Sequence, residues 1–400
     1  MKKLLFVAST LNTGGAQKIL SNLVMNLPAE YEATIVLNDT EDIVYPYKGR
    51  MISLGFREQA NKLSIFYQFR VFLKRIQVLR QLKNTGEYTA TISFLDSANF
   101  ANILSGKRKS KVLVSVHNNL SESAVSWVYR YIVNPMVKIL YYKADRVIAV
   151  SKGIEYDLIH NLGLSPDNVT TIYNGHDIES IRKQAKYDIP QEMAGVFKEG
   201  PVVATMGRLE HQKGQWHLIR AMAKVKTQIA NVKLIILGDG ELKPYLERLI
   251  AQYGLQANVV IAGFLDNPFC VLRKSDIFVL PSLYEGFPNA LIEALSVGIP
   301  CVCSDFRSGA REILAPDLPV QEQNMDDIRY EKYGVLVPVC DEKLYESEEL
   351  TCEEQCLAQG IVELLSKPEI CAIYRERAAE SVERLGSGRM VKEWMRVIEK

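Results

Sequence analysis

The residues best suited to bind a ligand lie in one run, Glu285-Gly286-Phe287-Pro288-Asn289-Ala290-Leu291-Ile292-Glu293, shortly after Pro281 ends a buried segment. Pro288 fits the first turn of a helix, and Gly286 lets a ligand approach the backbone. At 1.5 Å per helical residue, Glu285 and Glu293 are at most roughly 12 Å apart. This span matches the reach from the sugar to the ribose of a nucleotide sugar, so the two carboxylates could hold both ends. The alternative is a pair of surface carboxylates on an ordinary helix.

Phosphates between those two ends would meet positive groups. Backbone N–H groups at the start of the helix, Ala290 and Leu291 among them, are predicted to be free donors. A second anion site is predicted at Gly207-Arg208-Leu209-Glu210-His211-Gln212-Lys213-Gly214, directly after the segment 202–206. A diphosphate leaving group gains charge as a glycosidic bond breaks, so Arg208 and Lys213 would stabilise the transition state more than the ground state. A solvated basic turn is the alternative.

A weaker signal lies near the N-terminus, in Asn12-Thr13-Gly14-Gly15-Ala16-Gln17. This glycine pair opens a predicted helix, where N–H groups and the helix dipole favour an anion, and Gly15 is the candidate contact. The run lacks both the full Gly-x-Gly-x-x-Gly fingerprint and the Gly-Lys-Ser/Thr ending of a P-loop. A plain tight turn explains it about as well.

The elements that must position these residues follow from hydrophobic periodicity. Short β-branched runs alternate with longer helical patterns throughout the chain. The predicted strands are 3–9, 33–37, 89–94, 111–116, 146–150 and 169–172, then 202–206, 233–237, 258–262, 276–280 and 300–303. We therefore predict two doubly wound α/β domains, each with a parallel sheet.

The domain boundary is predicted from length and composition. A chain of 400 residues is too long for one ordinary core. Residues 186–201 contain two prolines and two glycines with little periodicity, so a linker is placed there. The predicted domains are 1–185 and 186–386. A final helix, 387–400, is expected to pack back on the first domain through Met390, Val391, Trp394, Val397 and Ile398.

Charge and cysteine usage narrow the class of protein. Residues 1–185 carry 23 Lys and Arg against 15 Asp and Glu, and the rest carries 25 against 32. The first half is therefore expected to approach an anionic surface or a phosphorylated acceptor, with chance variation of solvated faces as the alternative. The seven cysteines are odd in number and lack zinc-site spacing, so reduced thiols are expected.

Targeting signals are not evident. The apolar run 4–8 is too short for a signal-peptide core, and no segment offers the ~20 apolar residues of a membrane span. We expect a cytoplasmic protein that does not cross a bilayer.

With these motifs the chain resembles the family-four retaining glycosyltransferases over nearly its whole length. The resemblance rests on Glu285 and Glu293, on Gly207-Arg208 with Lys213-Gly214, and on Gly14-Gly15. Tyr173-Asn174-Gly175 and Tyr333-Gly334-Val335-Leu336-Val337-Pro338 also match family landmarks. It implies the GT-B fold, in which two Rossmann-like domains face each other across a cleft.

The resemblance also implies a role for each candidate residue. The diphosphate would be bound by Gly15, Arg208, Lys213, Ala290 and Leu291, the ribose by Glu293, and the base near Gly263-Phe264-Leu265. The transferred sugar would be bound by Glu285, as a catalytic residue, with Gly286, Phe287, Pro288 and Asn289.

His117, in Ser115-Val116-His117-Asn118, resembles the family's active-site histidine. In a retaining mechanism the leaving phosphate helps to deprotonate the acceptor, so His117 would bond the sugar. Without the resemblance, a lone histidine is more often a packed or surface residue.

Three features depart from the family pattern. The stretches 315–332 and 341–354 look longer than usual, and Gln17 stands where the family has Glu. These departures leave the acceptor side of the cleft less defined.

The stretch 62–83 carries six cations and no acidic residue, with aromatic and aliphatic residues between them. A basic helix with aromatic anchors suits an anionic membrane interface. The hypothesis is that this helix docks the protein to a membrane and presents a lipid-linked acceptor. A core helix with a solvated basic side is the alternative. The cations are Lys62, Arg70, Lys74, Arg75, Arg80 and Lys83.

The resulting prediction is a retaining hexosyltransferase that uses a nucleotide-diphosphate sugar, with a UDP sugar favoured, to build a bacterial surface glycan. Its acceptor is expected to be a glycan or a lipid-linked glycan, and no nucleic acid is expected as a partner. No metal or other cofactor is expected either, because Arg208 and Lys213 can supply the positive charge that a metal would provide. The main alternative is a nucleotide-sugar epimerase of the same fold. A nicotinamide-dependent oxidoreductase and a non-catalytic nucleotide-binding module are further alternatives.

Overall fold

The computed structural model describes residues 1–12, 14–41, 43–56, 65–122, 127–320, 325–346 and 348–400. The chain forms two compact units: unit 1 comprises Met1–His176 and Leu385–Lys400, and unit 2 comprises Asp177–Arg384. This boundary differs from the one predicted at residue 185. Helix α6 (Ile178–Gln184) packs on α9 and α10 and therefore belongs to unit 2.

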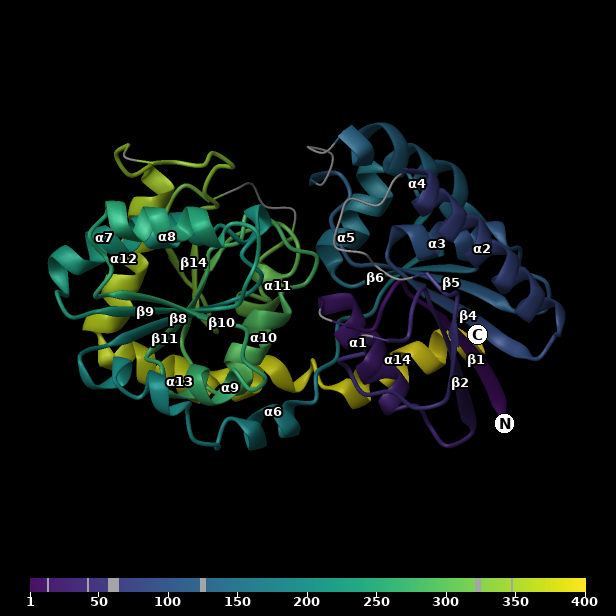
Figure 1. Cartoon of the computed structure of the whole chain (residues 1–400), viewed down its shortest axis with the longest axis horizontal. Coiled ribbons are helices and arrows are strands. Elements are labelled where there is room, and N and C mark those ends of the chain that lie inside the picture. The colour runs from purple at the N-terminus through teal and green to yellow at the C-terminus, as the bar shows by residue number, and fades with distance from the viewer. Residues whose placement is uncertain (13, 42, 57–64, 123–126, 321–324, 347) are drawn as a thin grey trace. The chain divides into compact units, whose positions relative to one another are not determined.

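Unit 1 is built on a parallel sheet with the strand order β3-β2-β1-β4-β5-β6-β7 (Figure 1). Residues of β1 alternate between its two faces. Leu4 and Phe6 join a core with helices α1 and α14, whereas Leu5 and Val7 join a core with α2 and α3. The strands are β1 (Lys2–Val7), β2 (Tyr31–Leu37), β3 (Arg50–Ser53), β4 (Tyr88–Phe94), β5 (Lys111–Val116), β6 (Arg146–Ala149) and β7 (Val169–Thr171).

Helices cover both faces of this sheet, which is why its strands are apolar on both sides. In Figure 1, α1 and α14 lie on one face, and α2, α3 and α4 lie on the other. The helices are α1 (Gly15–Met25), α2 (Ile65–Asn84), α3 (Asp96–Leu104), α4 (Asn134–Leu140), α5 (Lys152–Tyr156) and α14 (Ser387–Glu399). Short helical turns occupy Tyr129–Val133, Tyr141–Lys143, Asp157–Asn161 and Pro166–Asn168.

Unit 2 repeats the architecture with the strand order β10-β9-β8-β11-β12-β14-β13, in which only β13 is antiparallel among the described strands. The strands are β8 (Val202–Met206), β9 (Lys233–Leu237), β10 (Val259–Gly263), β11 (Ile277–Leu280), β12 (Cys301–Ser304), β13 (Arg329–Tyr330) and β14 (Val335–Val337). Besides α6, the helices are α7 (Gln215–Gln228), α8 (Lys243–Gln252), α9 (Phe269–Lys274), α10 (Asn289–Ser296), α11 (Ala310–Leu314), α12 (Cys352–Ser366) and α13 (Pro368–Glu383). Short turns occupy Gln191–Met193, Val196–Lys198 and His211–Lys213.

The two doubly wound sheets predicted from the sequence are confirmed, but three strands were missed. β3 is an edge strand in which no residue is fully buried, so it carries little hydrophobic signal. β13 spans only two residues. β14 is buried, but it is only three residues long and pairs with β12 in parallel.

Helix α2 corrects the basic face predicted in 62–83, because two of the six cations of this stretch are buried. Arg75 and Lys83 are each only 1% exposed. Lys83 donates to the carbonyl oxygens of Asn102 and Gly106, at 2.9 Å each, and burial lowers the pKa of Lys83 to about 7. Lys62 lies outside the described residues. The exposed face of α2 therefore includes Phe66, Phe69, Arg70, Leu73 and Lys74.

Helix α14 packs on unit 1 where Gly175 leaves room for it. A Cβ atom at Gly175 would lie 2.6 Å from Cβ of Met390 and 2.9 Å from Cα of Ser387. The N–H of His176 also donates to the carbonyl of Leu385 at 2.9 Å, so the two chain crossings between the units lie side by side. The glycine of Tyr173-Asn174-Gly175 is therefore required by packing.

We expect Gly175→Ala to lower the free energy of unfolding by about 1–3 kcal/mol, the usual cost of overpacking a well-filled core. Urea unfolding followed by circular dichroism measures it. The control is Gly388→Ala within α14, where a Cβ meets nothing within 4 Å. That control should stabilise the protein slightly, because glycine is a poor helix former. Equal stability of Gly175→Ala and wild type would contradict the packing.

Candidate functional site

The backbone segments that follow β8, β9 and β10 lie close together, and glycines at the contact points make this close approach possible. A Cβ atom at Gly238 would lie 2.0 Å from the carbonyl oxygen of Gly207, and one at Gly240 would lie 2.6 Å from that of Leu209. The N–H of Leu209 donates to the carbonyl of Asp239 at 3.0 Å. The run Gly238-Asp239-Gly240 thus belongs to the site. The sequence analysis missed it, although its two glycines directly after a buried strand are a readable signal.

Gly214 brings the basic turn onto the end of β11. Its φ of 61° is left-handed, and a Cβ there would lie 2.3 Å from the carbonyl oxygen of Pro281. The N–H of Leu283 donates to the carbonyl of Gln212 at 2.9 Å. Both the conformation and the close approach require glycine. The segment after β8 and the segment after β11 are therefore fastened to each other through their backbones.

This contact places Lys213 against Glu285. The Lys213 ammonium donates to Oε1 of Glu285 at 2.5 Å, and the two side chains are only 18% and 10% exposed. The hydroxyl of Ser282 donates to the same oxygen at 2.8 Å, and Nε2 of Gln212 donates to Oε2 at 3.3 Å. Gln212 and Ser282 are site residues that the sequence analysis did not single out. Their contribution depends on a contact between segments about 70 residues apart.

Positive groups beside the Lys213–Glu285 pair stay available to a ligand at this edge of the sheet. An ammonium has three donors, and among the described residues Lys213 uses one on Glu285. Arg208 is 61% exposed and pairs with Glu210 at 3.0 Å, a weak surface contact that an anion can displace. The turn is therefore partly buried, which argues against the alternative of a purely solvated basic turn.

Helix α10 begins directly after the Phe287-Pro288 pair. Gly309 makes room for this pair, because a Cβ there would lie 2.6 Å from Cδ of Pro288 and 2.9 Å from a ring carbon of Phe287. The sequence predicted Leu291 as a free donor, and this is wrong: its N–H donates to the carbonyl of Pro288 at 3.1 Å. Pro288 precedes the helix in an extended conformation, so its carbonyl closes the first turn. Ala290, in the same first turn, stays a candidate donor.

Both predicted carboxylates are buried, which excludes the alternative of two surface carboxylates. Glu293 lies on α10, and Glu285 lies in the loop before it. Phe264 follows β10 and is exposed, while Leu265 is half-buried. Gly263 adopts a φ of 74° and accepts a hydrogen bond from the N–H of Gly238 at 2.8 Å. Because the carboxyl ends of parallel strands lie at one edge of the sheet, the segments that carry these residues begin at the same edge as the segment that carries Lys213.

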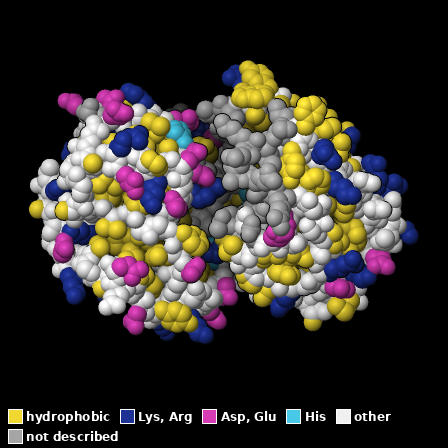
Figure 2. Space-filling model, in the orientation of Figure 1, with side chains coloured by type: hydrophobic (Ala, Val, Ile, Leu, Met, Phe, Trp, Pro, Cys, Tyr) yellow, Lys and Arg dark blue, Asp and Glu magenta, His cyan; other side chains and the backbone are white. Residues whose placement is uncertain are grey.

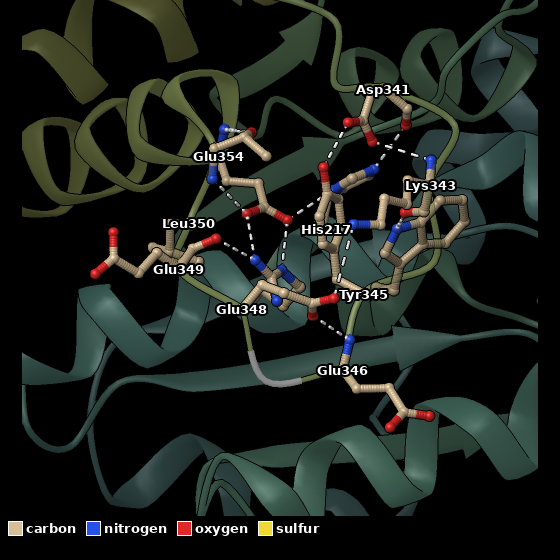
Figure 3. A network of polar contacts seen from close by, with 12 residues as sticks. His217, Asp341, Lys343, Tyr345, Glu346, Glu348, Glu349, Leu350 and Glu354 are labelled. Carbon is tan, nitrogen blue, oxygen red and sulfur yellow. Dashed lines mark hydrogen bonds and ion pairs between the residues drawn. The ribbon is translucent and has the colours of Figure 1, made fainter.

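A buried polar network holds the helix that follows Gly214 (Figure 3). Glu354 accepts hydrogen bonds from Nδ1 of His217 and Nε of Arg220, each at 2.7 Å. Burial acts to raise the pKa of Glu354, but these hydrogen bonds outweigh it and lower the pKa. Nε2 of His217 faces the carbonyl of Asp341 at 2.9 Å. The acidic stretch 341–354, apart from residue 347, which lies outside the described residues, is thus fastened to α7.

The other candidates lie in unit 1. Gly15 opens α1 after β1, and His117 follows β5, so both belong to the carboxyl edge of the first sheet. Nε2 of His117 lies 3.0 Å from the hydroxyl of Ser115, and burial lowers the pKa of His117 to about 3. The imidazole is therefore neutral near pH 7. The alignment of His117 with Glu285 of unit 2 stays a prediction.

The described part of the chain has no cluster of metal-ligating side chains. No group of three or more His, Cys, Asp or Glu side chains there could hold a metal ion. The described cysteines are all free thiols, and burial raises the pKa of Cys303 well above its ordinary value.

Two Rossmann-like units, with a cationic turn and buried carboxylates at the strand ends of the second, define a nucleotide-sugar-dependent glycosyltransferase of the GT-B fold. Residues 13–180 match the model "Glycosyltransferase Family 4" and residues 190–327 match "Glycosyl transferases group 1". An uncharacterized glycosyltransferase of Methanocaldococcus jannaschii is 32% identical over 356 residues, which cover 85% of this chain and 86% of the relative. The chain belongs to glycosyltransferase family 4 and is an enzyme of the hexosyltransferase type.

Two further proteins are similar over nearly their whole length. One is the Campylobacter jejuni N-acetylgalactosamine-N,N'-diacetylbacillosaminyl-diphospho-undecaprenol 4-alpha-N-acetylgalactosaminyltransferase, 28% identical over 382 residues, or 94% of both chains. The other is the Anabaena HepE protein, solved in complex with UDP-glucose, at 20% identity and a TM-score of 0.73 over 100% of both chains. The second likeness establishes the fold.

A double-mutant cycle tests the Lys213–Glu285 contact. We expect Lys213→Met, Glu285→Gln and the double variant to give a coupling energy of about 1–3 kcal/mol, because removing one partner leaves a mostly buried charge unpaired. Urea unfolding of the four proteins measures it. The control is the same cycle on the exposed pair Lys332–Glu380, which should couple clearly less. Equal coupling in the two cycles would contradict a buried pair.

Proposed function

We propose that this enzyme transfers a hexose or N-acetylhexosamine, with retention, from a UDP sugar to a glycan carried on a lipid diphosphate. The observation that carries the proposal is the Lys213–Glu285 pair, fastened at the strand ends by the contact of Gly214 with Pro281. It puts a cation for the leaving group beside a carboxylate for the sugar.

The reaction needs positive charge where the bond to the diphosphate breaks. The two remaining donors of Lys213, the guanidinium of Arg208 and the N–H of Ala290 supply it. These groups interact more strongly with the departing diphosphate than with the intact sugar nucleotide, because the diphosphate gains negative charge as the bond breaks. They therefore lower the activation barrier. Glu293 would bind the ribose hydroxyls, and Phe264 and Leu265 would lie against the base.

The transferred sugar is bound by residues of both units. Glu285 with Gly286, Phe287, Pro288 and Asn289 binds it from unit 2. His117 binds it from unit 1 when the units close on the donor. A pKa of about 3 makes His117 a poor general base near pH 7 but keeps a neutral imidazole available for a hydroxyl group. The leaving phosphate then takes the proton of the acceptor.

The acceptor class rests on charge and on a relative. Unit 1 carries 25 Lys and Arg against 15 Asp and Glu, whereas unit 2 carries 23 against 32. An anionic acceptor therefore fits unit 1 better. The Campylobacter jejuni transferase, similar over 94% of both chains, has diphospho-undecaprenol in its name. A lipid diphosphate in surface-glycan assembly fits both observations.

A lipid-linked acceptor requires access to a membrane surface, and unit 1 carries two groups of side chains suited to that contact. Phe66, Phe69 and Leu73 are exposed on α2, with Arg70 and Lys74 between them. A second group lies around α4, where exposed aromatic and aliphatic side chains are interspersed with cations (Figure 2). Its members are Trp127, Arg130, Tyr131, Lys138, Ile139, Tyr142 and Lys143. None of the helices described is both long and apolar enough to span a bilayer.

Turnover tests the proposal directly. Purified enzyme with UDP-N-acetylgalactosamine or UDP-glucose and a short diphosphoprenyl-linked glycan should release UDP and extend the acceptor, read by mass spectrometry. Lys213→Met should lower kcat/KM by about 10²–10³, the cost of losing one preorganised charge donor. Lys224→Met, an exposed cation on α7, is the matched control and should retain activity.

The same assay separates the alternatives. Sugar nucleotide consumed without release of UDP would favour an epimerase, and UDP binding without consumption would favour a binding module. Activity should survive EDTA, because the cationic turn supplies the charge; a loss restored by Mn²⁺ would refute the metal-free mechanism.

Vesicle co-sedimentation tests the membrane contact. We expect binding to anionic vesicles that weakens with salt, since each cation near the surface contributes about 1 kcal/mol. The double variants Phe66→Ser/Phe69→Ser and Arg70→Gln/Lys74→Gln should each lower the affinity about tenfold or more. Ile373→Ser, at an exposed apolar position in unit 2, is the control. Equal recovery with neutral and anionic vesicles would overturn this contact.

A further inference from the structure

Arg75 lies beneath the carboxyl ends of three neighbouring strands of unit 1. Its guanidinium donates to Oδ1 of Asn38 at 2.6 Å, to Oγ of Ser97 at 2.9 Å and to Oγ of Ser9 at 3.3 Å. Ser9 follows β1, Asn38 follows β2, and Ser97 follows β4, and these strands are adjacent in the order β2-β1-β4. A buried cation from α2 thus gathers three polar side chains at one edge of the sheet.

No carboxylate in the part of the chain that the structure describes balances the charge of Arg75. Among the described residues it forms no ion pair, and its buried Nε has no hydrogen-bond partner. The other two buried arginines of the described chain are paired, Arg220 with Glu354 and Arg311 with Asp305. Burial lowers the pKa of Arg75 only to about 10, so it stays charged near pH 7. A buried unpaired charge is costly, which points to a counter-charge from outside the described residues, and a bound anion would supply one.

The hydrogen bonds of Arg75 determine which way its partners point. A guanidinium only donates, so the oxygens of Ser9, Asn38 and Ser97 are its acceptors. Their own donors, two hydroxyl protons and one amide NH₂, are therefore directed elsewhere. Within the described structure these donors have no other partner. Ser97 is exposed and Ser9 is half-buried, so a ligand can reach both hydroxyls.

Three donor groups beside a cation that no described carboxylate balances suit an anion with several oxygens. The nearby carboxylates are engaged locally: Asp39 accepts the N–H groups of Thr40 and Glu41, and Asp96 accepts the hydroxyl of Tyr129 at 3.1 Å. The site lies at the same edge of the first sheet as the start of α1.

We propose that Ser9, Asn38 and Ser97, polarised by Arg75, bind the diphosphate of the acceptor, which makes this edge of unit 1 an acceptor-phosphate site. This inference rests on the proposed function for the identity of the anion. The hydroxyl and amide groups touch the phosphate oxygens. Arg75 acts through them as a positioning residue, because it is only 1% exposed.

Inorganic pyrophosphate is the first probe, titrated calorimetrically into the full chain with the nucleotide site saturated by UDP and the ionic strength held constant. Wild type should bind pyrophosphate. Arg75→Met should abolish the binding, and Ser9→Ala/Ser97→Ala should weaken it about tenfold, while UDP affinity is unchanged in both. Lys83→Met is the matched control, because Lys83 is an equally buried cation of α2. Its acceptors are the backbone carbonyls of Asn102 and Gly106 and the side-chain oxygen of Asn102, and none of these belongs to the proposed site.

Wild-type protein that binds no pyrophosphate, or Arg75→Met that binds it as wild type does, would overturn the site. If Arg75→Met fails to fold, the serine pair decides, since these hydroxyls are not fully buried. The pyrophosphate titration measures binding without turnover, so its result can be distinguished from a failure of the proposed transferase activity.

A kinetic arm separates a lipid-linked diphosphate from free phosphate. Ser9→Ala/Ser97→Ala should raise KM about tenfold for the diphosphoprenyl-linked glycan, with KM for the UDP sugar unchanged. For the same glycan lacking the diphosphate, the variant and wild type should have equal KM. An equal rise for both acceptors would overturn the assignment to the acceptor's diphosphate.

Discussion

The arrangement of unit 2 depends on one close backbone approach, that of Gly214 to Pro281. No side chain larger than hydrogen fits there, since a Cβ would lie 2.3 Å from a carbonyl oxygen. Because the two segments touch, Lys213 reaches Glu285, and an ion pair forms in a place that is largely shielded from water. Shielding strengthens the interaction of either group with a charged ligand. The cation and the carboxylate are thereby preorganised, as stabilisation of a developing charge requires.

Other contacts of unit 2 keep that approach in place. Helix α7 begins directly after Gly214, and the buried carboxylate of Glu354 holds it in place by binding His217 and Arg220. The two ring nitrogens of His217 lie 2.7 Å from Oε1 of Glu354 and 2.9 Å from the carbonyl oxygen of Asp341, so the ring is held at both ends. On the other side, Gly309 accommodates the Phe287-Pro288 pair. The acidic stretch that looked like an added loop is thus part of what supports the cationic turn.

The two units treat buried charge differently. In unit 2 each buried arginine has a carboxylate partner, as buried charges usually require. In unit 1 the buried cations Arg75 and Lys83 are surrounded by neutral oxygens of the described chain. The excess of positive charge on unit 1 therefore extends into its interior, below the strand ends where an acceptor would bind. This contrast is consistent with the proposal that unit 2 binds the nucleotide sugar and that unit 1 binds an anionic acceptor.

The sequence by itself determined the two parallel sheets, because strands buried on both faces must be apolar along their whole length, and it also located the basic turn and the Glu285–Glu293 run. It missed β3, since an exposed edge strand lacks that hydrophobic pattern. Only the tertiary structure decided which charged groups meet. Lys213 pairs with Glu285 across 72 residues, Leu291 loses its free N–H to Pro288, and Arg75 is buried although 62–83 was predicted to present a basic face to a membrane. Local periodicity reports how deeply an element is buried, whereas the partner of a charge depends on contacts between segments distant in the chain.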